Sequence, residues 1–235
     1  MTKDTATAMG GSVIDYDLAS RQHDAYVDAL SKIVDSVETL AADEAHPDCP
    51  FVENTVVYAR GTAVTLRQGH ESRRGEVDAV RDALATRPTF KNIKILHMDN
   101  PEAMCEGGDV LFTGRHMFVG ISEHTNEAGA AALADAFGPS LRVVAVPVLG
   151  ALHLKSLVSM LRPGILLYAK NGAGSEVVAR MAARVGRSVY RGVGVPDMLS
   201  ANVVGDREGR MERRLDSGRA MRGEPSPHSR VFHGG

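Results

Sequence analysis

One pattern occurs three times along this chain: two short apolar segments joined by a turn, then an amphipathic helix, then a third apolar segment. Alternating and helical spacing of apolar residues predicts these elements. Strands are predicted over residues 51–59, 62–66, 91–97, 107–113, 116–122, 141–147, 152–160 and 165–169, and helices over 76–84, 126–137 and 175–185. Units of about 50 residues that bury their apolar faces only against their neighbours are typical of ring-like repeat proteins.

The paired strands decide between two α/β architectures. A doubly wound sheet alternates single strands with helices, whereas each unit here places a pair of short strands before its helix. We therefore predict an α/β fold made of a propeller-like ring of ββαβ units. The residues that open the first strand of each unit are then expected to converge near one axis. A further helix is predicted over residues 18–40, ahead of the first unit.

Composition restricts the class of partner. The chain has 27 basic and 29 acidic residues among 235, so its formal charge of -2 gives no net attraction for nucleic acid or an anionic membrane. A small-molecule partner is expected instead. No segment approaches the roughly 20 apolar residues of a membrane span, and a cytoplasmic location is expected. The two cysteines, Cys49 and Cys105, have no metal-ligand spacing and cannot build a disulfide framework.

Acidic residues and one histidine gather where the three units begin. Carboxylates brought together there would repel one another unless a cation lay between them. A guanidinium is a planar cation whose donors match carboxylates in paired hydrogen bonds, so an arginine-like ligand is predicted. The residues expected to converge are Asp48, Glu53, Glu106, Asp109 and His153.

His153 has two interpretations. It lies between Leu152 and Leu154, so on a strand its side chain would point away from their face. Spacing alone favours a hydrogen-bonded core histidine. A carboxylate near the ring, such as that of Glu106, would instead raise the imidazole pKa and suit a general acid that protonates an amine leaving group.

Other features have ordinary explanations when taken singly. The pair Gly107-Gly108 is typical of a tight turn. The charges around Arg73 are more often a solvated cluster at a helix start than a carboxylate clamp. Cys105 adjoins Glu106, and a neighbouring carboxylate raises a thiol pKa. Both cysteines are therefore predicted to be structural.

Over residues 13–204 the chain resembles the dimethylarginine dimethylaminohydrolase family of the arginine-deiminase-like superfamily. The resemblance implies a pentein-type ring of five ββαβ modules and no metal or organic cofactor. It also implies hydrolysis of methylated arginine to citrulline and methylamine or dimethylamine through a covalent cysteine intermediate. The matching motifs are Arg21-Gln22-His23, Ala42-Asp43-Glu44, Pro47-Asp48-Cys49, Phe51-Val52-Glu53, Ser72-Arg73-Arg74, Glu76-Val77-Asp78, residues 107–115, Phe118-Val119-Gly120, Thr125-Asn126, residues 152–156, Val195-Pro196-Asp197 and Ala201-Asn202.

By this resemblance, catalytic roles fall on two residues. His153 is the general acid that later activates water, and Glu106 is its carboxylate partner. Five further positions match substrate contacts of the family. These are Asp48 and Glu53 on the guanidinium side, Arg73 at the amino-acid carboxylate end, and Asn54 and His124, where the family usually has an acid and an arginine.

The chain also departs from the family pattern. The family has a cysteine nucleophile near its C-terminus and a strand and substrate-covering lid at its N-terminus, and neither is found in these letters, so the ring is expected to be incomplete. Residues 205–235 are predicted to be a poorly ordered or non-homologous tail. Three hypotheses stay open: a methylarginine hydrolase represented by a variant chain, a non-catalytic arginine-binding or regulatory relative, and an incomplete ring that associates with another copy through open sheet edges.

Overall fold

A computed structural model of the chain describes residues 15–205 and 211–213, with side chains up to residue 204. Within this part, three sheets have three strands each and a fourth has two. In each three-stranded sheet the first two strands are antiparallel and the third joins parallel to the second after a helix. The predicted ββαβ unit is therefore present three times, and we call these units modules 1 to 3.

The helices and strands have the following bounds. Module 1 contains β1 Val56–Ala59, β2 Thr62–Thr65, α2 Glu76–Thr86 and β3 Lys94–His97. Module 2 contains β4 Val110–Phe112, β5 His116–Ile121, α3 Glu127–Phe137 and β6 Arg142–Pro147. Module 3 contains β7 Val158–Arg162, β8 Ile165–Ala169, α5 Gly172–Val185 and β9 Arg191–Val195. The remaining elements are α1 Tyr16–Leu30, α4 Leu154–Leu157, α6 Met198–Ala201, β10 Val203–Gly205, β11 Met211–Arg213 and the short 3-10 helices η1 Val52–Asn54, η2 Glu71–Arg73, η3 Pro88–Phe90, η4 Gly107–Asp109 and η5 Gly138–Ser140.

The same local chemistry recurs in successive modules. Gly61, Gly114 and Gly164 each turn a hairpin with a positive φ of 77–81°, a conformation that L side chains rarely adopt. The helices that follow in modules 2 and 3 begin in the same way, because Asn126 and Asn171 each accept a hydrogen bond from the backbone N–H three residues later. The repeat seen in the sequence is thus a repeat of turn and cap geometry.

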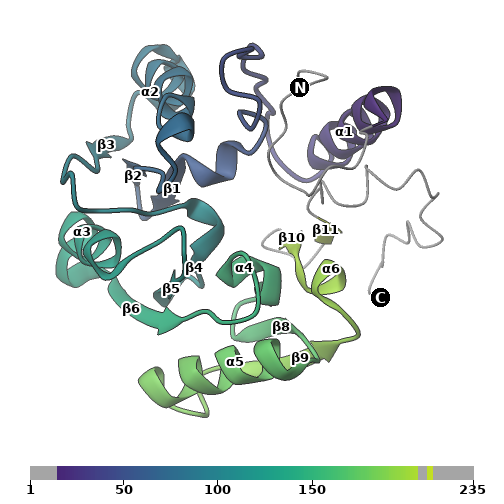
Figure 1. Cartoon of the computed structure of the whole chain (residues 1–235), viewed down its shortest axis with the longest axis vertical. Helices are drawn as coiled ribbons and strands as arrows, with labels where there is room; N and C mark the ends of the chain where they lie inside the picture. The colour runs from purple at the N-terminus through teal and green to yellow at the C-terminus, as the bar shows by residue number, and fades with distance from the viewer. Residues whose placement is uncertain (1–14, 206–210, 214–235) are drawn as a thin grey trace.

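The cores lie between modules, as a ring requires. One buried cluster joins modules 1 and 2 through Leu66, Met98 and Leu133, among others. A second joins modules 2 and 3 through residues such as Phe118 and Met181. In Figure 1, α2, α3 and α5 lie on the outside of the arrangement, and the short strands lie nearer its middle. Each module therefore buries its apolar face against the next one, which confirms the predicted propeller-like arrangement.

The helix predicted over residues 18–40 is shorter than expected. It spans Tyr16–Leu30 and ends at Ser31. The chain beyond it reaches module 1, where Glu38 pairs with Arg87 and accepts a hydrogen bond from Thr89. Leu40 also packs against the apolar cluster on α2. These long-range contacts outweigh the local helical spacing, so the prediction for residues 31–40 was wrong.

The first strand of each module begins later than predicted. A helical turn precedes it in every case: η1 before β1, η4 before β4 and α4 before β7. His153 is consequently not on a strand, because it is the N-cap residue of α4. The prediction that alternation sets its direction was wrong, and its direction is set by the cap. These three turns, rather than the strands, carry the candidate site residues.

The ends of the chain are described only in part. The tail predicted over residues 205–235 lies outside the described residues except for Gly205 and Met211–Arg213, which pair as β10 and β11. The first 14 residues also lie outside them. None of the helices in the described part is long and apolar enough to cross a membrane.

Candidate active site

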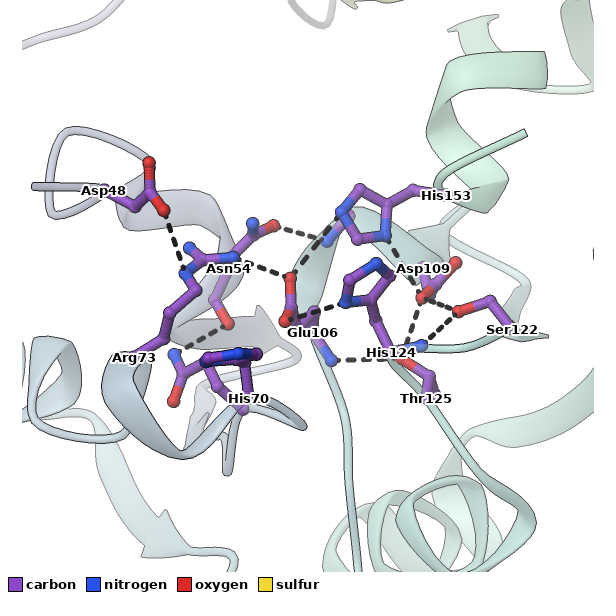
Figure 2. Close-up of polar contacts among 12 residues, drawn as sticks. Asp48, Asn54, His70, Arg73, Glu106, Asp109, Ser122, His124, Thr125 and His153 are labelled. Carbon is purple, nitrogen blue, oxygen red and sulfur yellow. Dashed lines mark hydrogen bonds and ion pairs between the residues drawn. The ribbon is translucent and has the colours of Figure 1, made fainter. Parts of the chain in front are cut away.

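The openings of the three modules meet at one place, as the repeat predicts. Figure 2 shows Asp48, Asn54 and Arg73 on one side and His153 and Asp109 on the other, with Glu106 between them. Their separation along the chain is large, so the arrangement depends on the packing of one module against another. The site therefore lies at the junction of modules 1, 2 and 3.

Two glycines allow this close approach. A side chain at Gly107 would place its Cβ 1.8 Å from the Glu53 carbonyl oxygen, and one at Gly108 would place it 2.7 Å from the His153 ring. The Gly108 N–H donates to Asn54 Oδ1 at 3.0 Å. The pair forms part of η4, but its absence of side chains is also what allows modules 1 and 3 to touch module 2 here.

Glu106 is the centre of the site. Its side chain is fully buried, and Oε2 lies 3.0 Å from Arg73 Nη1 and 3.6 Å from His153 Nε2. Oε1 lies 3.4 Å from His124 Nδ1 but makes no hydrogen bond of good geometry with the described residues. Burial would raise the pKa of this carboxyl group, but His124, Arg73 and His153 outweigh burial and lower it. Glu106 is therefore an ionised, buried carboxylate.

The His153 ring lies between two buried carboxylates. Its Nδ1 is 3.2 Å from Asp109 Oδ2, while its Nε2 faces Glu106 Oε2 at 3.6 Å. The ring can donate to both groups when it carries both protons. Its side chain is 12% exposed, which leaves it accessible to a small ligand. This geometry favours the acid–base interpretation over an ordinary core histidine.

Asp109 orients that ring, a role that the sequence did not assign. Its Oδ1 accepts the backbone N–H of Leu154 at 2.9 Å, and its Oδ2 accepts the hydroxyl groups of Ser122 and Thr125 at 2.7 and 2.8 Å. These bonds fix the carboxylate before it meets Nδ1 of His153. The recurrence of an acid at the start of a module was the signal for Asp109, but its partners are known only from the tertiary structure.

Arg73 is directed toward acids of its own chain. Its Nε and Nη2 donate to the two oxygens of Glu76 at 2.9 Å each, and Nη1 donates to Glu106 at 3.0 Å. Asp48 lies 3.9 Å from Nε. Glu76 was not among the predicted site residues, although its spacing of three from Arg73 along the chain was a readable signal. Binding of a substrate carboxylate by Arg73 stays a prediction.

The other predicted contacts lie around this centre. Glu53 is 44% exposed and pairs with the buried ammonium group of Lys155 at 2.6 Å. Hydrogen bonding to Glu106 raises the pKa of His124 and outweighs its partial burial. The His124 and His153 rings lie 5.1 Å apart, so two imidazoles flank one carboxylate.

Neither cysteine has the surroundings of a reactive thiol. Cys105 is fully buried, and burial followed by the charge of Asp109 raises the pKa of its thiol far above neutrality. Cys49 is half-buried, and its sulfur accepts a 3.5 Å contact from the backbone N–H of Asp43. In the part of the chain with described side chains, three or more possible metal ligands do not cluster anywhere.

Modules of this kind that place a histidine between buried carboxylates at their junction define a class: guanidino-group-modifying proteins of the pentein fold. Within that class the family can be stated. Residues 12–157 match the model of the eukaryotic N,N-dimethylarginine dimethylhydrolases, and the chain belongs to this family.

Individual relatives agree with this assignment. The N(G),N(G)-dimethylarginine dimethylaminohydrolase of Streptomyces coelicolor is 43% identical over 157 residues, which are 66% of this chain and 58% of that protein. Its counterpart in Pseudomonas aeruginosa is 35% identical over 158 residues, which are 66% of this chain and 60% of that one. The chain thus spans about three fifths of the length of these curated relatives.

Solved structures extend the likeness over more of the chain. A cysteine-to-serine mutant of the Pseudomonas aeruginosa protein, complexed with citrulline, superposes with a TM-score of 0.71 at 28% identity, covering 92% of this chain and 81% of that one. The N-terminal domain of a cyanobacterial arginine dihydrolase bound to substrate gives 0.66 at 18% identity, covering 81% and 70%. This second likeness concerns the fold alone.

Proposed function

We propose that this chain binds the guanidinium group of methylated arginine and supplies the acid–base part of its hydrolysis to citrulline and dimethylamine or methylamine. The observation that carries the proposal is His153, held at Nδ1 by Asp109 and facing Glu106 with Nε2. A protonated ring so placed can give a proton to a departing amine and then remove one from water. The acids nearby suit a guanidinium.

The chemistry has two steps that balance with one thiolate. The thiolate attacks the guanidinium carbon, and the C–N bond to the methylated nitrogen breaks as His153 transfers its proton to the leaving amine. Water, losing a proton to the same ring, then attacks that carbon, and citrulline leaves as the thiolate is restored. We do not assign the thiolate to Cys105, because this residue is fully buried and its thiol pKa is raised.

A second candidate is ligand binding without turnover, as in a regulatory relative. It is favoured by the surroundings of the two thiols and by the cations already paired with the acids: Arg73 with Glu106, and Lys155 with Glu53. Such a site would recognise methylated arginine but lack the group that attacks it. No metal or organic cofactor forms part of either proposal.

One experiment separates the two candidates. The purified chain is titrated with asymmetric dimethylarginine by calorimetry, and citrulline is assayed in the same samples. Citrulline formation that disappears in His153→Ala supports hydrolysis by this chain. Saturable binding that disappears in Asp48→Asn, without citrulline, supports the binding protein. Asp82→Asn, which changes an exposed acid on α2, is the matched control and should behave as the unmodified chain.

Two other expectations belong with this proposal. A cytoplasmic location suits a small charged metabolite of this kind. Association of copies through open sheet edges suits a chain in which three modules are described. Light scattering across a concentration series tests the second expectation, and a molecular mass that stays at 25.1 kDa throughout contradicts it.

A further inference from the structure

The side chain of Arg73 lies in a cage of carboxylates. Glu76 and Glu106 are 1% and 0% exposed at their side chains and accept its three hydrogen bonds. Asp48, 10% exposed, lies 3.9 Å from Nε on the same group. These three acids come from different parts of the chain, so the cage is formed by the tertiary structure. Figure 2 shows the Arg73 guanidinium between Asp48 and Glu106.

The cage matches the shape of a guanidinium rather than any cation. Glu76 receives Nε and Nη2 in a paired arrangement, and Glu106 receives Nη1 on another edge of the same plane. An ammonium group has no planar fork and cannot make the paired contact. Glu106 also keeps one buried oxygen, Oε1, without a hydrogen bond from the described residues. This oxygen is an acceptor that a further donor can use.

We propose that Asp48, Glu76 and Glu106 form a guanidinium-binding site that the chain's own Arg73 side chain fills, so that an external guanidinium competes with Arg73 for these carboxylates. Buried carboxylates without a cation are costly, and Arg73 offsets that cost while no ligand is present. Arg73 thereby acts as an internal ligand that restrains the site from accepting weaker cations.

The inference deepens the proposed function, and it rests on that function only for the identity of the natural ligand. Occupation of Glu106 by Arg73 means that a methylated arginine must share or replace this contact. The competition can be measured without methylated arginine, because a small guanidinium can take the place of the Arg73 group once that group is removed. Failure of the proposed enzymatic function would therefore leave this test unaffected.

The test uses the full chain with Arg73→Ala and methylguanidinium chloride as the probe, followed by thermal unfolding. We expect Arg73→Ala to melt below the unmodified chain and to regain stability saturably with methylguanidinium. At ten times the dissociation constant the rise should be about 3–6 °C. Methylammonium chloride at equal ionic strength should not reproduce it. The unmodified chain should not respond at the same millimolar concentrations.

The neighbouring arginine provides the matched control. Arg74 is 37% exposed at its side chain and pairs only loosely with an exposed acid, Glu71, at 3.8 Å. Arg74→Ala should therefore melt close to the unmodified chain and show no response to methylguanidinium. An equal response of Arg74→Ala and Arg73→Ala would overturn the proposal, because the effect would then not depend on the cage.

A variant that fails to fold still gives a result. If Arg73→Ala has no cooperative melt, it is refolded with methylguanidinium present, and recovery of a cooperative melt supports the proposal. Arg73→Gln keeps an amide donor toward Glu76 and provides a second measurement. The absence of any methylguanidinium-specific stabilisation or refolding in both variants overturns the proposal.

Discussion

Replacing Asp109 by asparagine should reveal how strongly one buried carboxylate holds the site together. The carboxylate accepts bonds from the Leu154 N–H, the hydroxyl groups of Ser122 and Thr125, and the His153 ring, at 2.7–3.2 Å. Asparagine has nearly the same shape but a single acceptor oxygen and two donors, so it cannot satisfy all four partners in either orientation.

The expected cost follows from these bonds. A hydrogen bond to a charged group contributes about 1.5–3 kcal/mol, and the hydroxyl groups can rotate to accept from the new amide, so we expect a net loss of about 3 kcal/mol. In a domain of this size that corresponds to a fall of about 6–12 °C in Tm. Circular dichroism melts measure it, after coincident far-UV and near-UV transitions have established two-state behaviour.

The control for Asp109→Asn is Asp82→Asn, the same chemical change at an exposed position on α2. This variant should melt within about 1 °C of the unmodified chain. If Asp109→Asn melts as high as Asp82→Asn, the carboxylate does not stabilise the junction of the modules. The account of His153 orientation given above would then be refuted.

Three further predictions concern single groups of the same region. Gly108→Ala should destabilise the chain by about 1–3 kcal/mol, because its Cβ would meet the His153 ring at 2.7 Å, whereas Gly172→Ala, with open space around it, should not, as denaturant unfolding can show. The raised pKa of His124 gives stability that is present below its ordinary pKa of 6.5 and is lost as pH rises through the raised value; Tm should therefore fall over that range, and His124→Asn should flatten the fall. The buried thiol of Cys105 should react with a thiol reagent only after unfolding, and labelling of the native chain at this residue would contradict its raised pKa.

Much of the fold was predictable because it depends on local chemistry. Turns that need a positive φ at Gly61 and Gly114, and a helix cap such as Asn126, are short-range features, and their recurrence indicated the modules. The end of α1 was not predictable in this way. Apolar spacing continues past Leu30, but Glu38 gains a partner 49 residues away, and no local pattern contains that information.

The candidate site divides along the same line. The sequence determined which chemical groups are available: the acids, His153 and the glycine pair at the module openings, together with the family resemblance over residues 13–204. Only the tertiary structure decided how they pair. It placed His153 at a helix cap between Asp109 and Glu106, and it directed the Arg73 fork to Glu76 and Glu106. The physical reason is that charge pairing depends on distances of a few ångströms between residues far apart in the chain, and those distances are set by how the modules pack.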